Sequence, residues 1–442
     1  MLLMDFAIIQ RDSDGYGRAV FSGQLPKEGP DNRVICARAV REEDNLALSN
    51  WLECEINPDK EEWSISLTLP EGGLYRLEAI QTEKNSSNPE WSSRIKTLYH
   101  IGVGDVWLAT GQSNMTGYGR DSAYDPPMLG VHALGNDGKW CIASQPLADA
   151  VNGIYEFPEN ATGTSPALSF ARTLSTRLNL PIGIIHTAVG GTPLSFWSPE
   201  EDGAGWKNTL RRFELVDKVK GIIWYQGCSD CSAELAPTYL ARFRKAVSCW
   251  RRDLADESLP VLTVQLNRWE AENKHDFDRF WGILRDAQRQ AALNIDNVYM
   301  VPALDLPCSD GIHNTSGANV IIGGRLANTA LQCVYGKSGQ TAALILRAER
   351  VDDTHLRLLL TEGHRVAPMD GFADGMNVED ENGMAECTAA AAGEDSLLVT
   401  VERPIGKNAV FHYAWRAKPP AFLPRDTHGM PLPACYGVKI EE

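Results

Sequence analysis

The sequence changes character within the segment Asp105-Val-Trp-Leu-Ala-Thr-Gly-Gln-Ser-Asn-Met115. The apolar run Val106–Ala109 is typical of a short buried strand. It breaks before Gly111, and three polar residues, Gln112 to Asn114, follow at once. Open α/β sheets carry their chemistry just beyond the carboxyl ends of strands. The pattern therefore predicts that Ser113 lies on a turn with its hydroxyl exposed.

Strand-like and helix-like runs alternate around this segment, from about residue 101 to residue 337. The expected strands are Val103–Ala109, Pro181–Val189, Gly221–Tyr225, Leu259–Leu266 and Val298–Leu306, and the expected helices are Pro166–Leu178, Ala236–Leu254, Phe280–Leu293 and Ser316–Tyr335. Such alternation predicts a parallel, doubly wound sheet. We expect the segment Gly119–Gly163 to be an irregular loop that walls the site.

Both flanks of this α/β region are β-rich. Turn residues separate short strand-like runs in residues 1–100 and again in residues 338–442. The expected strands are Arg33–Val40, Trp51–Ile56, Trp63–Leu69, Leu74–Ile80, Ala342–Arg350, His355–Leu360, Ser396–Val401 and Ala409–Trp415. We therefore expect three domains: residues 1–100 as a β-sandwich or jelly roll, residues 101–337 as the α/β domain, and residues 338–442 as a second β-sandwich.

The composition is that of an ordinary globular protein with an acidic balance. Of the 442 residues, 43% are hydrophobic and 23% are charged, and the formal net charge is −16. The acidic balance argues against a nucleic-acid surface. No apolar stretch approaches the ~18 residues that span a bilayer. The start, Met1 to Phe6, has no basic leader region, so we expect a cytoplasmic location; a chain whose leader had been removed would look the same. The sequence indicates no oligomeric state.

Ten cysteines are scattered through the chain, and only Cys228 and Cys231 are closely spaced. Such a pair supplies two of the four ligands that a structural zinc site needs. We therefore expect free thiols, no metal site and no cofactor.

Four predicted strand ends carry residues suited to acyl transfer through a serine. That chemistry needs a nucleophile, a base, a group that orients the base, and donors for the oxyanion. Ser113 is the candidate nucleophile, His313 the candidate base and Asp310 its orienting partner. The candidate oxyanion donors are the N–H of Ser113, a backbone N–H of Gly190 or Gly191, and the side-chain amide of Gln226. Each of these residues alone has an ordinary structural role, but their arrival at successive strand ends favours a shared site.

The same segments carry a family resemblance. Gly104–Met115, Pro181–Trp197 and Gly221–Gly227 resemble the first three sequence blocks of SGNH-type esterases of the sialate O-acetylesterase group. Asp310–His313, followed by Gly324–Ala327, resembles the last block. The resemblance implies a flavodoxin-like SGNH hydrolase domain that removes O-acetyl groups from carbohydrates, most directly from sialic acids. It implies the same roles for Ser113, Asp310, His313, Gly190, Gly191 and Gln226.

An acetylated sugar as substrate also needs contact residues. Sugars stack on aromatic side chains, and polar residues near the nucleophile are further candidates. The candidate substrate-binding residues are Gln112, Asn114, Trp197, Trp224, Tyr225 and Trp269. Packing in the core is the ordinary role for at least half of the aromatic ones.

One position departs from the pattern of that group. Cys228 stands where a glutamate usually follows Gln-Gly, and in some relatives that carboxylate is proposed to help orient the histidine. Asp310 is the candidate for this role here, and Asp230 a second one. Cys228 itself has no basic neighbour that would activate it as a nucleophile. Two alternatives stay open: an esterase of acetylated xylan or another hemicellulose, and a carbohydrate-binding protein that has lost catalysis.

Overall fold

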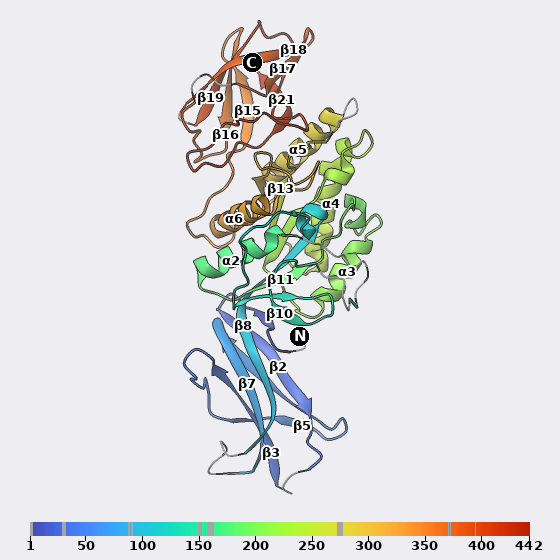
Figure 1. The fold of residues 1–442 in the computed structure, drawn as a ribbon, viewed down its shortest axis with the longest axis vertical. Coiled ribbons are helices and arrows are strands. Elements are labelled where there is room, and N and C mark those ends of the chain that lie inside the picture. Colours follow the sequence, from blue (N-terminus) through green and yellow to red (C-terminus); the bar gives the residue numbers. More distant parts are fainter. Residues whose placement is uncertain are drawn as a thin grey trace.

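A computed structural model describes residues 3–28, 32–86, 89, 92–148, 153–154, 156, 163–271, 277–369, 371, 373–393 and 395–442. The chain runs from a β-rich part at one end, through an α/β part in the middle, to a β-barrel at the other end (Figure 1). The fold is mixed α/β, with one large mixed sheet and a separate barrel.

The middle of the large sheet has the strand order β10-β9-β11-β8-β12-β13-β14. The strands are β8 (Ser93–Gly111), β9 (Val131–Leu134), β10 (Trp140–Ile142), β11 (Ile182–His186), β12 (Gly221–Tyr225), β13 (Val261–Gln265) and β14 (Val298–Pro302). All neighbouring pairs are parallel except β9 with β10. The expected parallel sheet is thus present, and the strand order reverses at β8. Binding sites of open α/β sheets lie at such a reversal.

Helices cover the two sides of these strands (Figure 1). They are α1 (Ser113–Thr116), α2 (Pro166–Leu178), α3 (Ala204–Phe213), α4 (Tyr239–Asp253), α5 (Phe277–Asn294) and α6 (Ser316–Cys333). Helix α2 begins and ends where the sequence predicts. The Ser165 hydroxyl caps its first turn by accepting the N–H of Ala167, Pro166 occupies the first position, and Asn179 ends it in a left-handed conformation. No helix within the described ranges is long and apolar enough to cross a membrane.

Strand β8 joins the first two parts of the chain. Its first half pairs with β7 (Gly72–Glu83), and residues 102–104 pair with β1 (Ile8–Gln10). Its second half pairs with β11 and β12. The boundary expected at residues 100 and 101 therefore falls inside one continuous strand.

The rest of the N-terminal part contains one separate sheet of three strands and an extension of the large sheet that begins at β7. Strands β2 (Tyr16–Gln24), β6 (Glu62–Pro70) and β5 (Glu55–Asn57) form the separate sheet. Strand β3 (Arg33–Arg41) pairs with β4 (Leu52–Glu53) and with β7. Side chains of the sheets share one apolar core, to which Phe21, Ile35 and Trp63 contribute.

The C-terminal part closes into a barrel, whereas the sequence predicted a sandwich of two sheets. The barrel order is β15-β16-β19-β18-β17-β20-β21. Its strands are β15 (Ile345–Arg350), β16 (His355–Leu360), β17 (Met376–Asp380), β18 (Gly383–Ala392), β19 (Ser396–Val401), β20 (Val410–Tyr413) and β21 (Cys435–Glu441). It closes because β15 pairs with β21, and irregularities in three strand pairs bend the sheet.

Two further expectations need correction. The segment Gly119–Gly163 is not wholly irregular, because it contributes β9 and β10 to the sheet, although residues 149–152, 155 and 157–162 lie outside the described part. Helix α3 was not expected at all. Its ten residues include four charged or amide side chains, and its buried face contains the polar residues Asn208, Thr209 and Arg212, so few apolar residues mark it in the sequence.

Candidate active site

Ser113 lies directly beyond the carboxyl end of β8. Gly111 has a φ of 135°, and a Cβ there would lie 2.3 Å from the carbonyl oxygen of Tyr225, so only glycine fits. The chain then turns at Gln112, and Ser113 becomes the first residue of α1. As the first helical residue, it has no partner for its N–H within the helix. The nucleophile candidate thus presents a backbone N–H beside its hydroxyl.

The candidate base, His313, and its orienting group, Asp310, lie next to Ser113, although they come about 200 positions later in the sequence. The Nε2 atom of His313 lies 3.0 Å from the Ser113 Oγ, and Nδ1 lies 2.8 Å from Oδ2 of Asp310. The other Asp310 oxygen accepts the N–H groups of Ile312 and His313. The ring of Tyr118 stacks on the imidazole with centroids 4.9 Å apart. The three residues form a continuous Ser-His-Asp line, as acyl transfer requires.

Electrostatics keep the orienting carboxylate ionised. Partial burial acts to raise the pKa of Asp310, but hydrogen bonds from the His313 ring and from two backbone N–H groups outweigh it and lower the pKa to about 2. Asp310 is therefore an acceptor for the Nδ1–H of His313 at neutral pH, which leaves Nε2 free to take the serine proton.

A set of buried asparagines fixes the loop that carries His313. Oδ1 of Asn114 accepts the N–H of Asn314, and its Nδ2 donates to the carbonyl of Ile312. The Nδ2 of Asn267 donates to the same carbonyl at 2.7 Å and to Oδ1 of Asn314 at 2.8 Å. Asn114, expected among the substrate contacts, is buried and ties the serine turn to the histidine loop. Sequence reasoning missed Asn267 and Asn314, although both follow strand-end positions already singled out.

Gln112, the other polar candidate for substrate contact, also links two strand ends. Its Oε1 accepts the N–H of Gly227 at 2.9 Å, so the ends of β8 and β12 are joined beside Ser113. The end of β11 lies alongside as well, because the Val189 N–H donates to the Gly111 carbonyl. Gly190 and Gly191 follow directly, and Gly191 is exposed with a φ of 69°. Their backbone is thus placed next to the serine turn.

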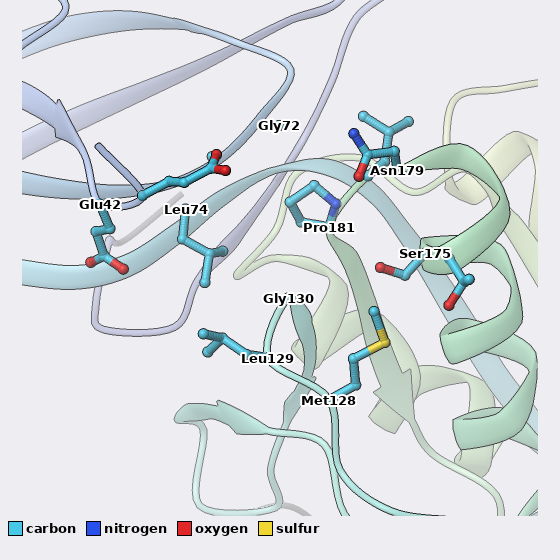
Figure 2. A pocket seen from close by; sticks show the side chains of 13 residues that line it. Glu42, Gly72, Leu74, Met128, Leu129, Gly130, Ser175, Asn179 and Pro181 are labelled. Carbon is cyan, nitrogen blue, oxygen red and sulfur yellow. The ribbon is translucent and has the colours of Figure 1, made fainter. Parts of the chain in front are cut away.

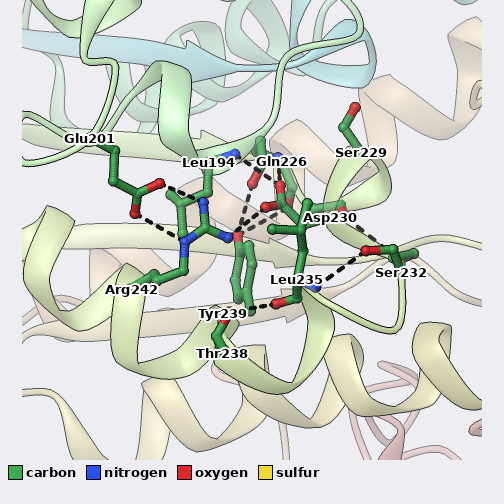
Figure 3. A network of polar contacts seen from close by, with 12 residues as sticks. Leu194, Glu201, Gln226, Ser229, Asp230, Ser232, Leu235, Thr238, Tyr239 and Arg242 are labelled. Carbon is green, nitrogen blue, oxygen red and sulfur yellow. Dashed lines mark hydrogen bonds and ion pairs between the residues drawn. The ribbon is translucent and has the colours of Figure 1, made fainter.

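Gln226 does not have the geometry expected of an oxyanion donor. Its side chain is fully buried, and its amide nitrogen donates to the carbonyl of Thr192 at 3.1 Å and to Oδ2 of Asp230 at 2.7 Å (Figure 3). Its Oε1 accepts the hydroxyl of Tyr239. Both amide hydrogens are occupied inside the protein, so the assignment of Gln226 to the oxyanion is corrected.

Asp230 orients Gln226 and not the histidine. One of its oxygens accepts from Gln226 and from the N–H of Leu194, and the other accepts from Arg242 at 2.9 Å (Figure 3). Arg242 is held in turn by both oxygens of Glu201. Asp310, and not Asp230, therefore occupies the orienting position at His313.

The cysteines beside this network show no sign of activation. Burial raises the pKa of the Cys228 thiol to about 12, so it is protonated at neutral pH and is a poor nucleophile. All ten cysteines are free thiols. Among the residues that the structure describes, no three His, Cys, Asp or Glu side chains are grouped as a metal site would need.

Most aromatic candidates for sugar stacking lie in the core. Trp197, Trp224 and Tyr225 are fully buried, and the Trp224 ring contacts Trp197 and Trp250. A strand of a parallel sheet is covered on both faces, so side chains of β12 have no route to solvent. Trp269 is the one of the four that keeps exposed surface, and it packs against Phe277.

A separate cavity of about 720 Å³ lies at the opposite, amino-terminal edge of the strands. Pro181, which precedes β11, lines this cavity together with Leu74, Met128 and Glu42 (Figure 2). This cavity lies between the N-terminal part and the strands of the α/β part, and Ser113, His313 and Asp310 do not line it. The chemistry therefore belongs to the carboxyl edge.

Known proteins share sequence and fold with this chain. Residues 103–332, just over half of the chain, match the family described as carbohydrate esterase, sialic acid-specific acetylesterase. The sialate O-acetylesterases of Rattus norvegicus and Homo sapiens are each 22% identical to this chain, over 55% and 57% of its length. The chain spans 58% and 56% of those two relatives. A carbohydrate acetylesterase from Xanthomonas citri has a similar fold, with a TM-score of 0.71, 21% identity, and 98% and 97% of the two chains covered.

Proposed function

Because the chain belongs to the carbohydrate esterase, sialic acid-specific acetylesterase family, we propose that it is a serine esterase that hydrolyses O-acetyl esters on carbohydrates. The observation that carries the proposal is the unbroken line from Ser113 through His313 to Asp310. We propose O-acetylated sialic acids as the substrate class. The family description and the two relatives named as sialate O-acetylesterases support that choice.

In the first half of the proposed reaction, Ser113, His313 and Asp310 act together. The Ser113 Oγ attacks the acetyl carbonyl carbon while Nε2 of His313 takes its proton. Asp310 stabilises the imidazolium that forms. The oxyanion lies against the N–H of Ser113 and the backbone of Gly190 and Gly191, with no contribution from Gln226. The tetrahedral intermediate then collapses, and the sugar oxygen leaves with the proton from His313.

The second half returns the enzyme to its starting state. His313 takes a proton from water, the hydroxide attacks the acetyl-Ser113 carbonyl, and the Ser113 oxygen leaves and regains its proton from His313. Acetate is released. Every step uses groups of this chain, and residues 101–337, a flavodoxin-like SGNH domain in this proposal, hold all of them.

The test compares wild type with two serine variants. Ser113→Ala removes the nucleophile and should lower kcat on p-nitrophenyl acetate by on the order of 10⁴- to 10⁶-fold. Ser229→Ala is the matched control, because Ser229 lies beside the same strand ends and its side chain points away from the network in Figure 3. Full activity of Ser113→Ala would overturn the mechanism.

The substrate class is tested separately, by acetate release from O-acetylated sialic acid and from acetylated xylan. A higher kcat/KM on the sialic acid supports the proposal, and a higher value on xylan replaces the substrate class while keeping the mechanism. An inert wild type that binds these glycans would mean that the protein has lost catalysis.

A further inference from the structure

A cavity of about 450 Å³ opens in the C-terminal barrel, and none of the residues assigned above lines it. Three segments line it: the residues before and at the start of β17, one residue of β18, and the segment after β20. We propose that it is a sugar-binding subsite, which holds a neutral ring of the glycan that carries the acetyl ester. The inference rests on the proposed function for the identity of the glycan. The polar and aromatic lining residues are Asp374, Asn377, Glu386, Trp415, Arg416 and Lys418.

Trp415 supplies an oriented aromatic surface. It is partly exposed, and its Nε1–H donates to Oδ1 of Asn377 at 3.0 Å. The rings of Tyr436 and His412 pack against it, with centroids 5.5 and 5.8 Å away. An indole held in this way is pre-ordered, so a ligand that stacks on it gains contact without the cost of fixing the side chain.

The polar groups of the lining select a ligand without net charge. Asn377 donates to one oxygen of Glu386 at 2.6 Å, and the other oxygen lies 3.9 Å from Arg416. Asp374 and Lys418 add one charge of each sign. The charges of the two carboxylates and the two cations sum to zero. A lining without net charge disfavours both a phosphate-like anion and a metal ion. Hydroxyl groups, which both donate and accept, suit such mixed partners.

The remaining lining is apolar. Pro419 and Pro420 border the cavity, and they present carbon surface without an N–H donor. A ligand that matches the whole lining has hydroxyls along its edge and carbon-bound hydrogens on its face. A pyranose ring has that distribution, whereas a purely apolar ligand would take water from the polar lining groups and offer them no hydrogen bond in return.

Backbone hydrogen bonds connect this cavity to the catalytic loop. The Trp269 N–H donates to the carbonyl of Ala417 at 2.9 Å, and the N–H of Glu270 donates to the carbonyl of Gly311, between Asp310 and His313. The path from Ala417 to Gly311 crosses two hydrogen-bonded backbone pairs and one step along the chain, from Trp269 to Glu270. The two residues therefore lie within roughly 15 Å of each other. Ala417 lies between the lining residues Arg416 and Lys418, so this distance separates the border of the cavity from the loop of His313, and an oligosaccharide is long enough to span it.

The experiment compares Trp415→Ala with Phe422→Ala. Phe422 is 73% exposed on the same segment and does not line the cavity, so it is a matched control. The substrates are p-nitrophenyl acetate, O-acetylated sialyllactose and acetylated xylohexaose. Trp415→Ala removes one stacking contact. It should therefore raise KM for the preferred glycan by a factor about 10-fold larger than its effect on KM for p-nitrophenyl acetate. Trp415→Phe, which keeps an aromatic face, should recover most of that difference, and Phe422→Ala should show none.

Three outcomes would overturn the subsite. An unchanged KM for both glycans does so, and so does an equal loss on the glycans and on p-nitrophenyl acetate, because that result indicates a structural role. If the wild type hydrolyses none of the substrates, the proposed function fails, and calorimetric titration with lactose and xylohexaose still tests the cavity. Binding that Trp415→Ala abolishes would then support it, and no binding to the wild type would overturn it.

Discussion

Arg285 offers the sharpest test of how the barrel and the catalytic part are held together. Its side chain is fully buried, and none of its partners is a carboxylate. All five N–H groups are satisfied by backbone carbonyls, namely those of Leu266, Asn267, Ala414, Arg416 and Ala417. Two of these carbonyls follow β13 and three follow β20. Burial lowers the pKa of Arg285 to about 9, which still leaves it charged at neutral pH.

The count of donors gives the expected cost of Arg285→Lys. A lysine ammonium keeps the charge but has three donors in place of five. At least two carbonyls lose their partner, and each hydrogen bond to a charged group contributes about 1.5 kcal/mol or more. The free energy of unfolding should therefore fall by about 3 kcal/mol. The catalytic rate should fall as well, because Asn267 carries both one of these carbonyls and the side chain that fixes the His313 loop.

Urea unfolding followed by tryptophan fluorescence measures the first effect, and kcat on p-nitrophenyl acetate measures the second. Arg251→Lys is the matched control. Arg251 is also buried, but within the described part of the chain its side chain donates to two carbonyls, those of Leu259 and Asp296, both in the α/β part. Three lysine donors suffice for two acceptors, so the control should lose less than half as much stability. Equal losses in the two variants would refute the explanation by donor count.

Two further predictions concern the carboxylates near the site. Asp310→Asn should lower kcat on p-nitrophenyl acetate by about 10⁴-fold with little change in KM, because the His313 ring loses the acceptor that fixes its tautomer. Because the pKa of Asp310 is lowered in the folded state, its ionised form stabilises the fold at any pH above the ordinary carboxylate pKa. The difference in the free energy of unfolding between wild type and Asp310→Asn should therefore shrink as the pH falls toward about 2. A difference that does not depend on pH would contradict this explanation. Asp230→Asn should cost about 3–5 kcal/mol in urea unfolding, because it removes the buried charge that pairs with Arg242 and leaves one acceptor oxygen where the Gln226 amide and Arg242 now use two. Glu201→Gln, at the exposed end of the same network, should cost at most about 1 kcal/mol, and equal costs would show that Asp230 is not its anchor.

The local structure of the site could be predicted from the sequence more completely than the directions in which its side chains point. Helix α2 was bounded correctly because Ser165, Pro166 and the apolar spacing all act within a few residues. The approach of His313 to Ser113 followed from the rule that parallel strands present their carboxyl ends at one edge. The pairing of Asp310 with His313 needed only a spacing of three residues on one loop.

The features that could not be predicted from the sequence depend on contacts between residues far apart in the chain. The direction of the Gln226 amide is decided by Asp230 and Tyr239, which belong to later elements. The barrel differs from a sandwich through the pairing of its first strand with its last, and neither strand differs locally from one of a sandwich. The burial of Trp224 and Tyr225 was deducible, since both lie inside an apolar run that the sheet covers on two faces.

The continuity of β8 has a consequence for the order in which the chain folds during synthesis. The N-terminal sheets can pair with its first half as soon as Gly104 has left the ribosome, but β12, the second neighbour of its other half, begins only at Gly221. At about 5–20 residues per second, the apolar run Val106–Ala109 waits some 5–20 s for that neighbour. During this time the second half of β8 has at least one unpaired edge, which is the kind of edge that chaperones bind and that drives aggregation when they are absent.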